Sequence, residues 1–478
     1  MTPERAQLED VLRSLGDVRY ADVRYTATHA QDVKVRNGEV DHLASTVDRA
    51  VGVRVLVGNG WGFAATSDVS EETIRRTARR ALEVAAASNL ASTQIITLSD
   101  VEPHVARWES HYEIDPWSVP IEKKLEHLMN ATEPMRGDPR IHQVSGDISC
   151  YRQEKVFAST IGSFIEQTTT QMGGGIEAVA IDEGEFQRRT YPNPFGGDFQ
   201  AEGWEFIERL DLPKKALEIR DEALQLLAAS KAPAGRFDLI VGSAQLALQV
   251  HESCGHPTEL DRAMGLEISL AGGSFLQPQM LGHFRYGSDL VNIVADATIP
   301  GSIGSFAFDD DGVPAQRFHL VRDGTFVDYL TGRDTAPFLG RVSNGTVRAE
   351  TAARIPIIRM TNINLEPGTT PLADLIADTK RGIFVETNKS WSIDDLRLNF
   401  QFGCEVAWEI ENGRLTRLLK NPLYTGNTPD FWRSCDAVGD RASWQIWGLP
   451  NCGKGDPMQT MRVAHGAPAA RFRNVEMG

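Results

Sequence analysis

Two histidines and a glutamate stand close together near the middle of the chain, in the segment 251–256 with the sequence HESCGH. The neutral imidazoles of His251 and His256 are ligands that zinc prefers, and the Glu252 carboxylate beside them is able to take a proton from a metal-activated water. The common zinc-protease pattern, H-E-x-x-H, places its histidines four residues apart. Here they are five residues apart, so the same chemistry requires a different backbone.

A regular α-helix would not bring these two histidines to one ion. Residues i and i+5 lie about 140° apart around the helix axis, whereas i and i+4 lie about 40° apart. Either a wide π-helical turn restores the alignment, or the helix ends and His256 returns from the following loop. Gly255 and Pro257 suit both arrangements, because glycine tolerates unusual backbone and proline stops a helix. On spacing alone, two unrelated core or capping histidines are an equal alternative.

The residues before the motif predict a rigid support for it. Phe237–Val241 is a short apolar run that ends at Gly242, which is typical of a buried strand. Ser243 is predicted to cap a helix that begins at Ala244 and leads into the motif. A strand, a turn and a helix would therefore hold the candidate ligands.

Composition restricts the class of protein. The chain has 478 residues, of which 41% are hydrophobic and 24% charged, as in globular proteins with two or three domains. A formal net charge of −16 argues against a nucleic-acid or membrane partner. The first residues show no signal peptide and no segment is apolar enough to span a membrane, so a cytoplasmic location is expected. Five widely spaced cysteines, an odd number, argue against a disulfide framework.

The amino-acid pattern predicts an α+β protein of three domains. The first, residues 1–104, is expected to be an antiparallel sheet covered by helices. Its predicted strands are 20–26, 31–36, 39–43, 50–57 and 60–65, with hairpin turns at Asn37-Gly38 and Gly58-Asn59 and helices over 3–15 and 70–87.

The middle domain is predicted to span residues 105–230. Its expected elements are helices near 118–136 and 212–230 and strands near 143–150, 155–160 and 164–171. Residues 183–203 are polar and rich in glycine and proline, which predicts a loop. The linker Lys231–Gly235 leads to a strand-rich C-terminal domain, residues 236–478, that carries the HExxxH helix.

Several blocks of sequence resemble the TldD/PmbA family of metallopeptidases, and most closely its motif-bearing TldD-type subunit. The resemblance extends over nearly the whole chain, and the order of the blocks matches the family. They are His251–Asp261, Gly301–Ser305, Asp309–Gly312, Arg359–Asn362, Glu411–Arg417 and Asn451–Gly455.

The resemblance implies a zinc-dependent peptidase. His251, His256 and Cys452 would bind Zn²⁺, and Glu252 would be the catalytic base. Two histidines and a thiolate leave a fourth tetrahedral position open, as a catalytic zinc site requires. A soft thiolate also favours zinc over magnesium or calcium.

Other groups of the same chemical kinds have more ordinary interpretations. Cys254 lies inside the motif but is expected to pack in the core, and His283 and His319 are expected to be hydrogen-bonded structural histidines. Glu259 and Asp261 either orient the motif histidines or cap local structure, and the sequence leaves both open.

The resemblance also implies a substrate class and a partner. Members of the family act on unfolded or short peptides as homodimers or as heterodimers with a PmbA/TldE-like paralogue, with the active site enclosed in the dimer. Two alternatives are an amide hydrolase for a small-molecule or modified-peptide intermediate of natural-product biosynthesis, and a non-catalytic partner subunit. The Asp309–Gly312 run predicts a turn rather than a calcium loop, and no pattern selects Tyr329 or another group as the one that polarises a carbonyl.

Overall fold

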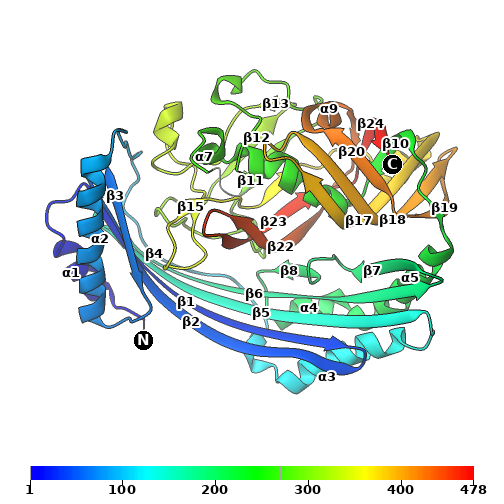
Figure 1. Ribbon diagram of the computed structural model, residues 1–478, viewed down its shortest axis with the longest axis horizontal. Helices are drawn as coiled ribbons and strands as arrows, with labels where there is room; N and C mark the ends of the chain where they lie inside the picture. Colours follow the sequence, from blue (N-terminus) through cyan, green and yellow to red (C-terminus); the bar gives the residue numbers. More distant parts are fainter. Residues whose placement is uncertain (1, 268–271) are drawn as a thin grey trace.

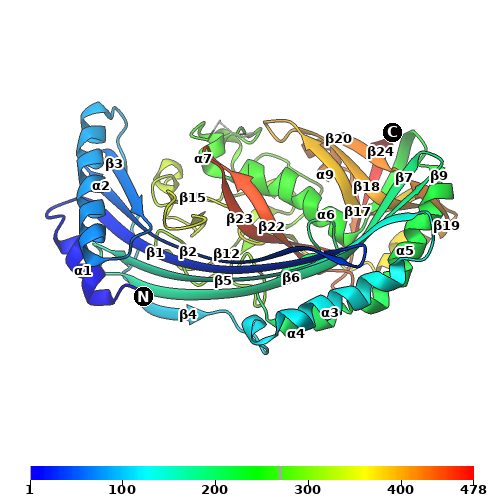
Figure 2. The same ribbon diagram turned by 60° about the horizontal axis from the view of Figure 1, so that its bottom comes forward.

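The computed structural model describes residues 2–267 and 272–478, so Met1 and residues 268–271 of the predicted domains lie outside it. The described chain is a mixed α+β structure, which confirms the predicted fold class. A long curved sheet forms one side, and the strand-rich C-terminal segment lies against its concave face (Figures 1 and 2).

The curved sheet is built by the first half of the chain. Its strands run in the order β3-β2-β1-β5-β6-β4, with β7 and β8 also paired to β6. Their bounds are β1 (Tyr20–Arg36), β2 (Glu39–Val57), β3 (Gly60–Thr66), β4 (Val105–Glu109), β5 (Ile141–Ser159), β6 (Phe164–Asp182), β7 (Glu185–Tyr191) and β8 (Asp198–Gln200). The helices are α1 (Arg5–Arg13), α2 (Glu71–Ala91), α3 (Ile121–Thr132), α4 (Trp204–Leu210) and α5 (Leu212–Ala228).

Four of these strands are longer than predicted. β1, β2 and β5 each join two segments that were predicted as separate strands, and β6 continues beyond residue 171, where its predicted strand ends. β1 has 17 residues and β2, β5 and β6 have 19 each, a length of roughly 60 Å at about 3.3 Å per residue. The predicted break in β1 falls at Ala27–Ala30, where the sequence favours no strand. There β1 pairs with β2 on one side and β5 on the other, and pairing on both sides overrides the local preference.

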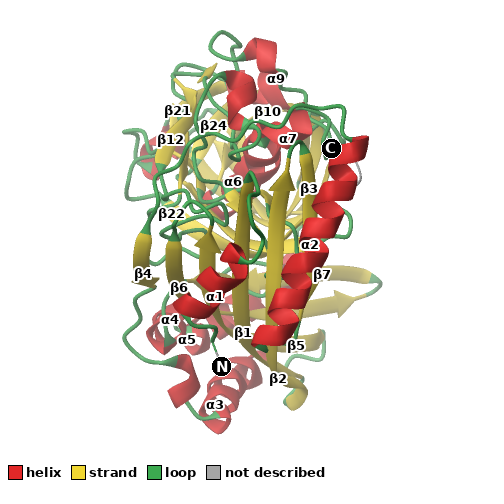
Figure 3. Cartoon of the chain, turned by 90° about the vertical axis from the view of Figure 1, so that its left-hand side faces the viewer, coloured by secondary structure: helices red, strands yellow, loops and turns green. Residues whose placement is uncertain are grey.

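Helices cover the two ends of this sheet separately (Figures 1 and 3). One apolar cluster lies between α1, α2 and the strands, and a second lies under α3, α4 and α5. Strands β1–β3 of the first predicted domain and β4–β8 of the second lie side by side in the one sheet, so the boundary predicted at residue 104 does not separate two sheets. The hairpin turns at Asn37-Gly38 and Gly58-Asn59 are confirmed.

The predicted loop over residues 183–203 is wrong in part. Residues Glu185–Tyr191 form β7 and Asp198–Gln200 form β8, both antiparallel to β6. The turn at Glu183-Gly184, with positive φ at both residues, begins this return of the chain. Pairing with β6 therefore outweighs the glycine and proline content on which the loop prediction depended.

The C-terminal segment contains a second large sheet, of order β17-β10-β24-β20-β18-β19-β9 with β21 on β24. Its strands are β9 (Ser230–Lys231), β10 (Gly235–Val241), β17 (Arg381–Ile393), β18 (Asn399–Glu411), β19 (Arg414–Lys420), β20 (Leu423–Asn427), β21 (Cys435–Val438) and β24 (Ala470–Met477). Smaller sheets comprise β11 (Ile293–Asp296), β12 (Arg317–Arg322), β13 (Thr325–Phe326) and β16 (Ile363–Leu365); β14 (Val347–Arg348) and β15 (Ile357–Ile358); and β22 (Gln445–Lys454) and β23 (Gln459–Ala467). The helices are α6 (Ser243–Val250), α7 (Leu260–Ala263), α8 (Leu372–Ala377) and α9 (Thr428–Arg433).

The Asp309–Gly312 run is a turn, as predicted, and it attaches the C-terminal segment to the curved sheet. Asp310 accepts hydrogen bonds from Lys155 of β5 at 3.0 Å, and Asp311 pairs with Arg54 of β2 at 2.6 Å. Gly312 has a φ of 79°, which favours glycine. These ion pairs connect the C-terminal segment to the curved sheet.

All five cysteines are buried and free, in agreement with the prediction of no disulfide framework. Among the described residues, no helix is both long and apolar enough to cross a membrane.

Candidate metal centre

The motif is mounted as predicted, on a strand followed by a buried helix. β10 lies between β17 and β24 in the C-terminal sheet, and Gly242 leads from it into α6. The predicted cap is wrong, because Gly242 occupies the N-cap position and Ser243 instead donates its hydroxyl hydrogen to the carbonyl of Ala467 at 2.6 Å. Ser243 therefore ties the start of the motif helix to β23.

A π-helical turn over His251–Gly255 resolves the five-residue spacing. Of the two arrangements that the sequence allowed, the wide turn is the one present, and a 3₁₀ turn follows at His256–Thr258. It brings the imidazole rings of the two histidines to a centroid separation of 4.7 Å. The irregular backbone required by the spacing is thus confirmed.

Neighbouring side chains satisfy the carbonyl groups that such a turn leaves free. The hydroxyl of Thr258 donates to the carbonyls of Cys254 and Gly255, at 2.9 and 2.8 Å. Tyr286 donates its hydroxyl hydrogen to the carbonyl of Ser253. Gly255 has no room for a side chain, because a Cβ there would lie 2.0 Å from Sδ of Met360.

The turn brings His251 and His256 together with Cys452 of β22. Their ligand atoms all lie within 4.8 Å of one another, and all three side chains are buried. Nε2 of His256 is 3.8 Å from Sγ of Cys452. Two such ligands on a tetrahedral zinc ion would be about 3.6 Å apart, given the usual Zn–N and Zn–S lengths, so the geometry fits a metal.

A chain of hydrogen bonds orients the ring of His251. Nδ1 of His465 lies 3.1 Å from the carbonyl of Ile363, which only accepts, so that nitrogen carries the hydrogen. Burial holds the pKa of His465 well below its ordinary value, so the ring is neutral and its Nε2 is an acceptor. Nδ1 of His251 lies 2.7 Å from that Nε2 and therefore donates to it. The free electron pair of His251 is left on Nε2, as a metal ligand requires.

Glu259 orients the other histidine, which answers the question that the sequence left open. Its carboxylate accepts a hydrogen bond from Nδ1 of His256 at 3.0 Å and another from Arg262 at 2.6 Å. Burial alone would raise the pKa of Glu259, but Lys454 and Arg262 hold it well below its ordinary value. Asp261 accepts a hydrogen bond from Lys454 at 2.8 Å. It therefore positions the lysine that pairs with Glu259 and does not contact the histidine itself.

Burial and nearby charges favour the metal-binding protonation states. Burial lowers the pKa of His251 and of His256 to about 4, so both rings are neutral at neutral pH. Burial would raise the pKa of the Cys452 thiol, but the Arg359 guanidinium and His256 outweigh it, and the pKa lies below its ordinary value. Two neutral imidazoles and a stabilised thiolate form a donor set suited to zinc.

Glu252 lies beside these ligands and is also buried. Arg397, in the turn between β17 and β18, donates to its Oε2 at 2.8 Å. This contact restricts the orientation of the carboxylate. His465, Arg359 and Arg397 were not predicted, since each lies far along the chain from the motif and no local pattern distinguishes it.

The remaining predicted residues lie outside the cluster. Cys254 packs in the core, where burial raises its pKa to about 12, and it accepts a hydrogen bond from Tyr286 at 3.2 Å. His319 lies on β12 beside Glu366, and His283 is exposed. Tyr329 is fully buried in the same apolar core.

His465 gives a first testable prediction. In His465→Ala, the ring of His251 loses its acceptor, and divalent-metal affinity is expected to fall about 10–100-fold, the usual cost of removing such a partner. Competition with a chromophoric chelator would measure this loss. His319→Ala removes a histidine remote from the cluster and should leave affinity unchanged. Equal affinities for the two variants would contradict the role given to His465.

Comparison with known proteins identifies the family. Models described as the PmbA/TldA metallopeptidase domain 1, central domain and C-terminal domain match residues 21–85, 114–229 and 234–478. A metalloprotease of Methanocaldococcus jannaschii is 33% identical over 89% of this chain and 90% of its own length. A metalloprotease TldD homolog of Haemophilus influenzae is 27% identical over 100% and 98% of the two chains.

Solved structures agree on the fold. TldE from Thermococcus kodakarensis superposes with a TM-score of 0.73 at 18% identity, covering 99% of this chain and 100% of its own. Together with the sequence matches, this shows that the chain belongs to the TldD/PmbA family of metallopeptidases.

Proposed function

We propose that this protein is a zinc-dependent peptidase that hydrolyses amide bonds in unfolded or short peptides. The observation that carries the proposal is the buried convergence of His251, His256 and Cys452 next to the carboxylate of Glu252. A zinc metalloprotease TldD homolog of Saccharolobus solfataricus, 21% identical over 96% of each chain, supports the choice of metal.

His251, His256 and Cys452 would hold the ion, each through its remaining free ligand atom. Bound zinc would supply a Lewis acid and a water that is nucleophilic near neutral pH. Three protein ligands leave one position for water or substrate, as in catalytic rather than structural zinc sites. The hydrogen bonds from the two Nδ1 atoms to His465 and Glu259 keep both rings in place.

Glu252 would carry the proton during hydrolysis. Its carboxylate accepts a proton from the attacking water and then delivers it to the nitrogen of the departing amine, so that one water is consumed for each bond broken. Arg397 holds Oε2 at 2.8 Å and thereby positions the carboxylate. Burial of the whole group excludes bulk water from the site.

Metal removal tests this function directly. Dialysis against a zinc chelator is expected to abolish cleavage of a short-peptide panel, and one equivalent of Zn²⁺ is expected to restore it, whereas Mg²⁺ and Ca²⁺ are not. Mass spectrometry should find product pairs that sum to the substrate plus one water.

The same assay, with small-molecule amides and modified peptides added to the panel, separates the alternative functions. Cleavage of small-molecule amides or modified peptides, but not of plain peptides, would identify an amide hydrolase of natural-product biosynthesis. A zinc-loaded wild type that cleaves nothing would favour a non-catalytic subunit.

The proposal includes assembly into a dimer, and the edge of β2 supports it. β2 pairs with β1 along its length but with β3 only from Val51 onward. Among the described strands, none covers the other edge of Glu39–Ala50. Val40, Leu43 and Val47 are 51%, 49% and 57% exposed. An open edge with exposed apolar side chains is suited to pairing with another chain.

Val40, Leu43 and Val47 are arranged in a way that favours a shared interface. Leu43 lies opposite Val33, Val40 opposite Val35 and Val47 opposite His29, so all three apolar side chains occupy one face of the sheet. Leu43→Lys with Val47→Lys is expected to convert a dimer to a monomer in light scattering, while Leu90→Lys, at an exposed site on α2, should not. A dimer that survives both charges would contradict this interface, whereas a wild type that is monomeric on its own would favour the heterodimer with a PmbA/TldE-like paralogue.

A further inference from the structure

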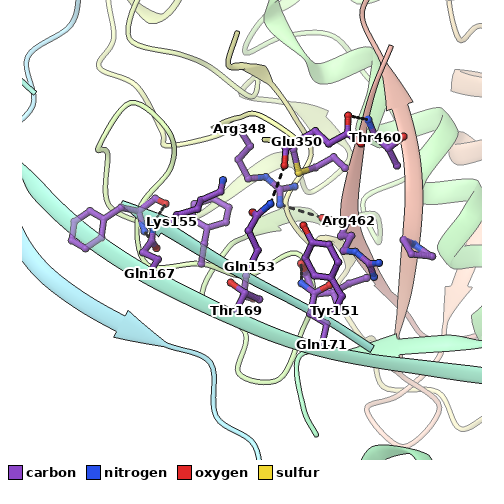
Figure 4. Close-up of a pocket in the computed structure, with 16 residues that line it drawn as sticks. Tyr151, Gln153, Lys155, Gln167, Thr169, Gln171, Arg348, Glu350, Thr460 and Arg462 are labelled. Carbon is purple, nitrogen blue, oxygen red and sulfur yellow. Dashed lines mark hydrogen bonds between the residues drawn. The ribbon is translucent and has the colours of Figure 1, made fainter. Parts of the chain in front are cut away.

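A cavity of about 200 Å³ lies between the curved sheet and the C-terminal segment. Figure 4 shows Tyr151, Gln153 and Thr169 extending from the sheet strands toward Arg348 and Arg462 of the C-terminal segment. A single water needs only about 10–15 Å³ of such volume. The cavity therefore has room for a chemical group of several heavy atoms.

The cavity borders the hairpin that carries the cysteine of the metal cluster. Met461, one of its lining residues, lies directly opposite Cys452 in the β22–β23 pairing. Pro450, two residues before Cys452 on the same strand, also lines it. A molecule in the cavity would thus contact the hairpin that carries Cys452, although the three candidate ligands do not themselves line the cavity.

The charge of the lining is opposite to that of the whole protein. Lys155, Arg348 and Arg462 are cationic and only Glu350 is acidic, in a chain with a formal net charge of −16. Lys155 is already paired with Asp310. The two arginines are the remaining positive charges.

Neither arginine is neutralised within the described part of the chain, where no carboxylate forms an ion pair with Arg348 or Arg462. Arg348 is only 7% exposed and donates to two backbone carbonyls, those of Arg462, at 3.1 Å, and Met360. Burial, together with Arg359, lowers its pKa to about 9. Arg462 lies over the ring of Tyr151, 4.1 Å from the centroid.

Arg348 is buried and Arg462 is partly buried. An unpaired charge in such surroundings is costly, so these two beside an open cavity indicate an absent anion. A guanidinium group presents a planar fork of donors that matches a carboxylate, and packing over an aromatic ring restricts its movement. Arg348 lies 5.3 Å from the ring centroid of Phe306, and Arg462 is held by Tyr151 in the same way.

The other polar lining groups are largely satisfied within the protein. Gln167 donates to the carbonyl of Phe308 at 2.9 Å and accepts from the amides of Ala307 and Phe308. Gln153 donates to Thr28 and to the carbonyl of Glu350. The Glu350 carboxylate accepts from the amide of Thr460 at 3.2 Å. Recognition of an anion therefore depends on the two arginines.

We propose that this cavity binds a carboxylate group of the peptide that is cleaved, with Arg348 and Arg462 as the recognising groups. The inference rests on the peptidase function proposed above and adds a substrate class to it. The carboxylate comes either from the C-terminus of the peptide or from an Asp or Glu side chain.

Binding of matched peptides to the zinc-loaded Glu252→Gln protein tests the proposal without interference from cleavage. One pair has uncharged side chains and ends in a free acid or an amide. The other pair is amidated and contains Asp or Asn. Hydrogen bonds to charged groups contribute about 1.5–3 kcal/mol, so in at least one pair the acid should bind roughly tenfold more tightly or better.

Substitution of Arg462 should remove this preference. Arg462→Gln is expected to equalise the acid and its neutral partner, whereas Arg462→Lys, which keeps the charge but not the planar fork, should retain a smaller difference. Arg441→Gln is the matched control, because Arg441 lies over the ring of Trp444, 4.2 Å from its centroid, outside the cavity. Unchanged zinc content would show that each variant is folded.

The outcomes separate this inference from the peptidase proposal. A preference confined to one pair supports the inference and identifies the source of the carboxylate. No preference in the wild-type cavity, or a preference that survives Arg462→Gln, overturns it. Cleavage of neutral peptides by the unsubstituted enzyme would then leave the peptidase function intact. Carboxylate binding without any cleavage would instead remove the peptidase function and keep the binding site.

Discussion

Replacement of Glu252 by glutamine is expected to slow peptide hydrolysis by about 10²–10⁴-fold, the usual contribution of a general acid–base group. The glutamine keeps the size of the side chain and an oxygen able to accept from Arg397, but it is unable to take the proton of water. Because Glu252 is not among the three clustered ligands, zinc content should stay at one ion per chain. Steady-state cleavage and elemental analysis of the same samples would measure both.

The control for this variant is another ion-paired glutamate. Glu366 forms ion pairs with Arg317 and His319, remote from the cluster, and Glu366→Gln should retain wild-type turnover. Cleavage by Glu252→Gln at the wild-type rate would exclude Glu252 as the catalytic base. Loss of zinc from Glu252→Gln would show instead that the carboxylate supports the metal site.

Replacement of Cys452 by serine is expected to have the largest effect on metal binding. A hydroxyl is not ionised at neutral pH and is a poor zinc ligand, whereas Arg359 and His256 lower the pKa of the Cys452 thiol and favour the thiolate. Loss of an outer partner already costs about 10–100-fold in affinity, so loss of a direct ligand should cost more than about 100-fold. Chelator competition would measure the change, and cleavage should disappear in parallel.

Cys435→Ser is the matched control, since Cys435 is equally buried, at 2% exposure against 4% for Cys452, and lies outside the cluster. Both variants bury a hydroxyl in place of a thiol, so a difference between them reports on the metal. Full zinc affinity in Cys452→Ser would remove Cys452 from the ligand set. It would say nothing about His251 and His256, which would need their own substitutions.

The irregular turn at the motif was predictable from local sequence, because the spacing of the two histidines alone requires it. Two histidines five residues apart share an ion only if the backbone widens, and Gly255 permits the close approach of Met360 that the widened turn needs. Cys452 was predicted through the family resemblance, since 196 residues separate it from His256. No local pattern spans that distance.

Residues that position the candidate ligands and Glu252 by hydrogen bonds were harder to predict. His465 is a single histidine on a strand, and only the fold places it behind His251. Arg397 has a positive φ of 64° in a tight turn, which no pattern indicated. The long strands were underestimated for a related reason, because pairing on both sides of β1 and β5 determines their length, and pairing depends on distant residues.

The pairing of β10 with β24 has a consequence for how the protein is made. Gly235 of β10 lies opposite Met477 of β24, so the strand that supports the motif is completed only when a much later part of the chain arrives. Such distant pairings form slowly, and N-terminal elements emerge first during synthesis. A nascent chain would therefore carry His251 and Glu252 for a long time without Cys452 or a finished sheet around them. If the proposed peptidase function holds, hydrolytic capacity would be withheld until folding is nearly complete.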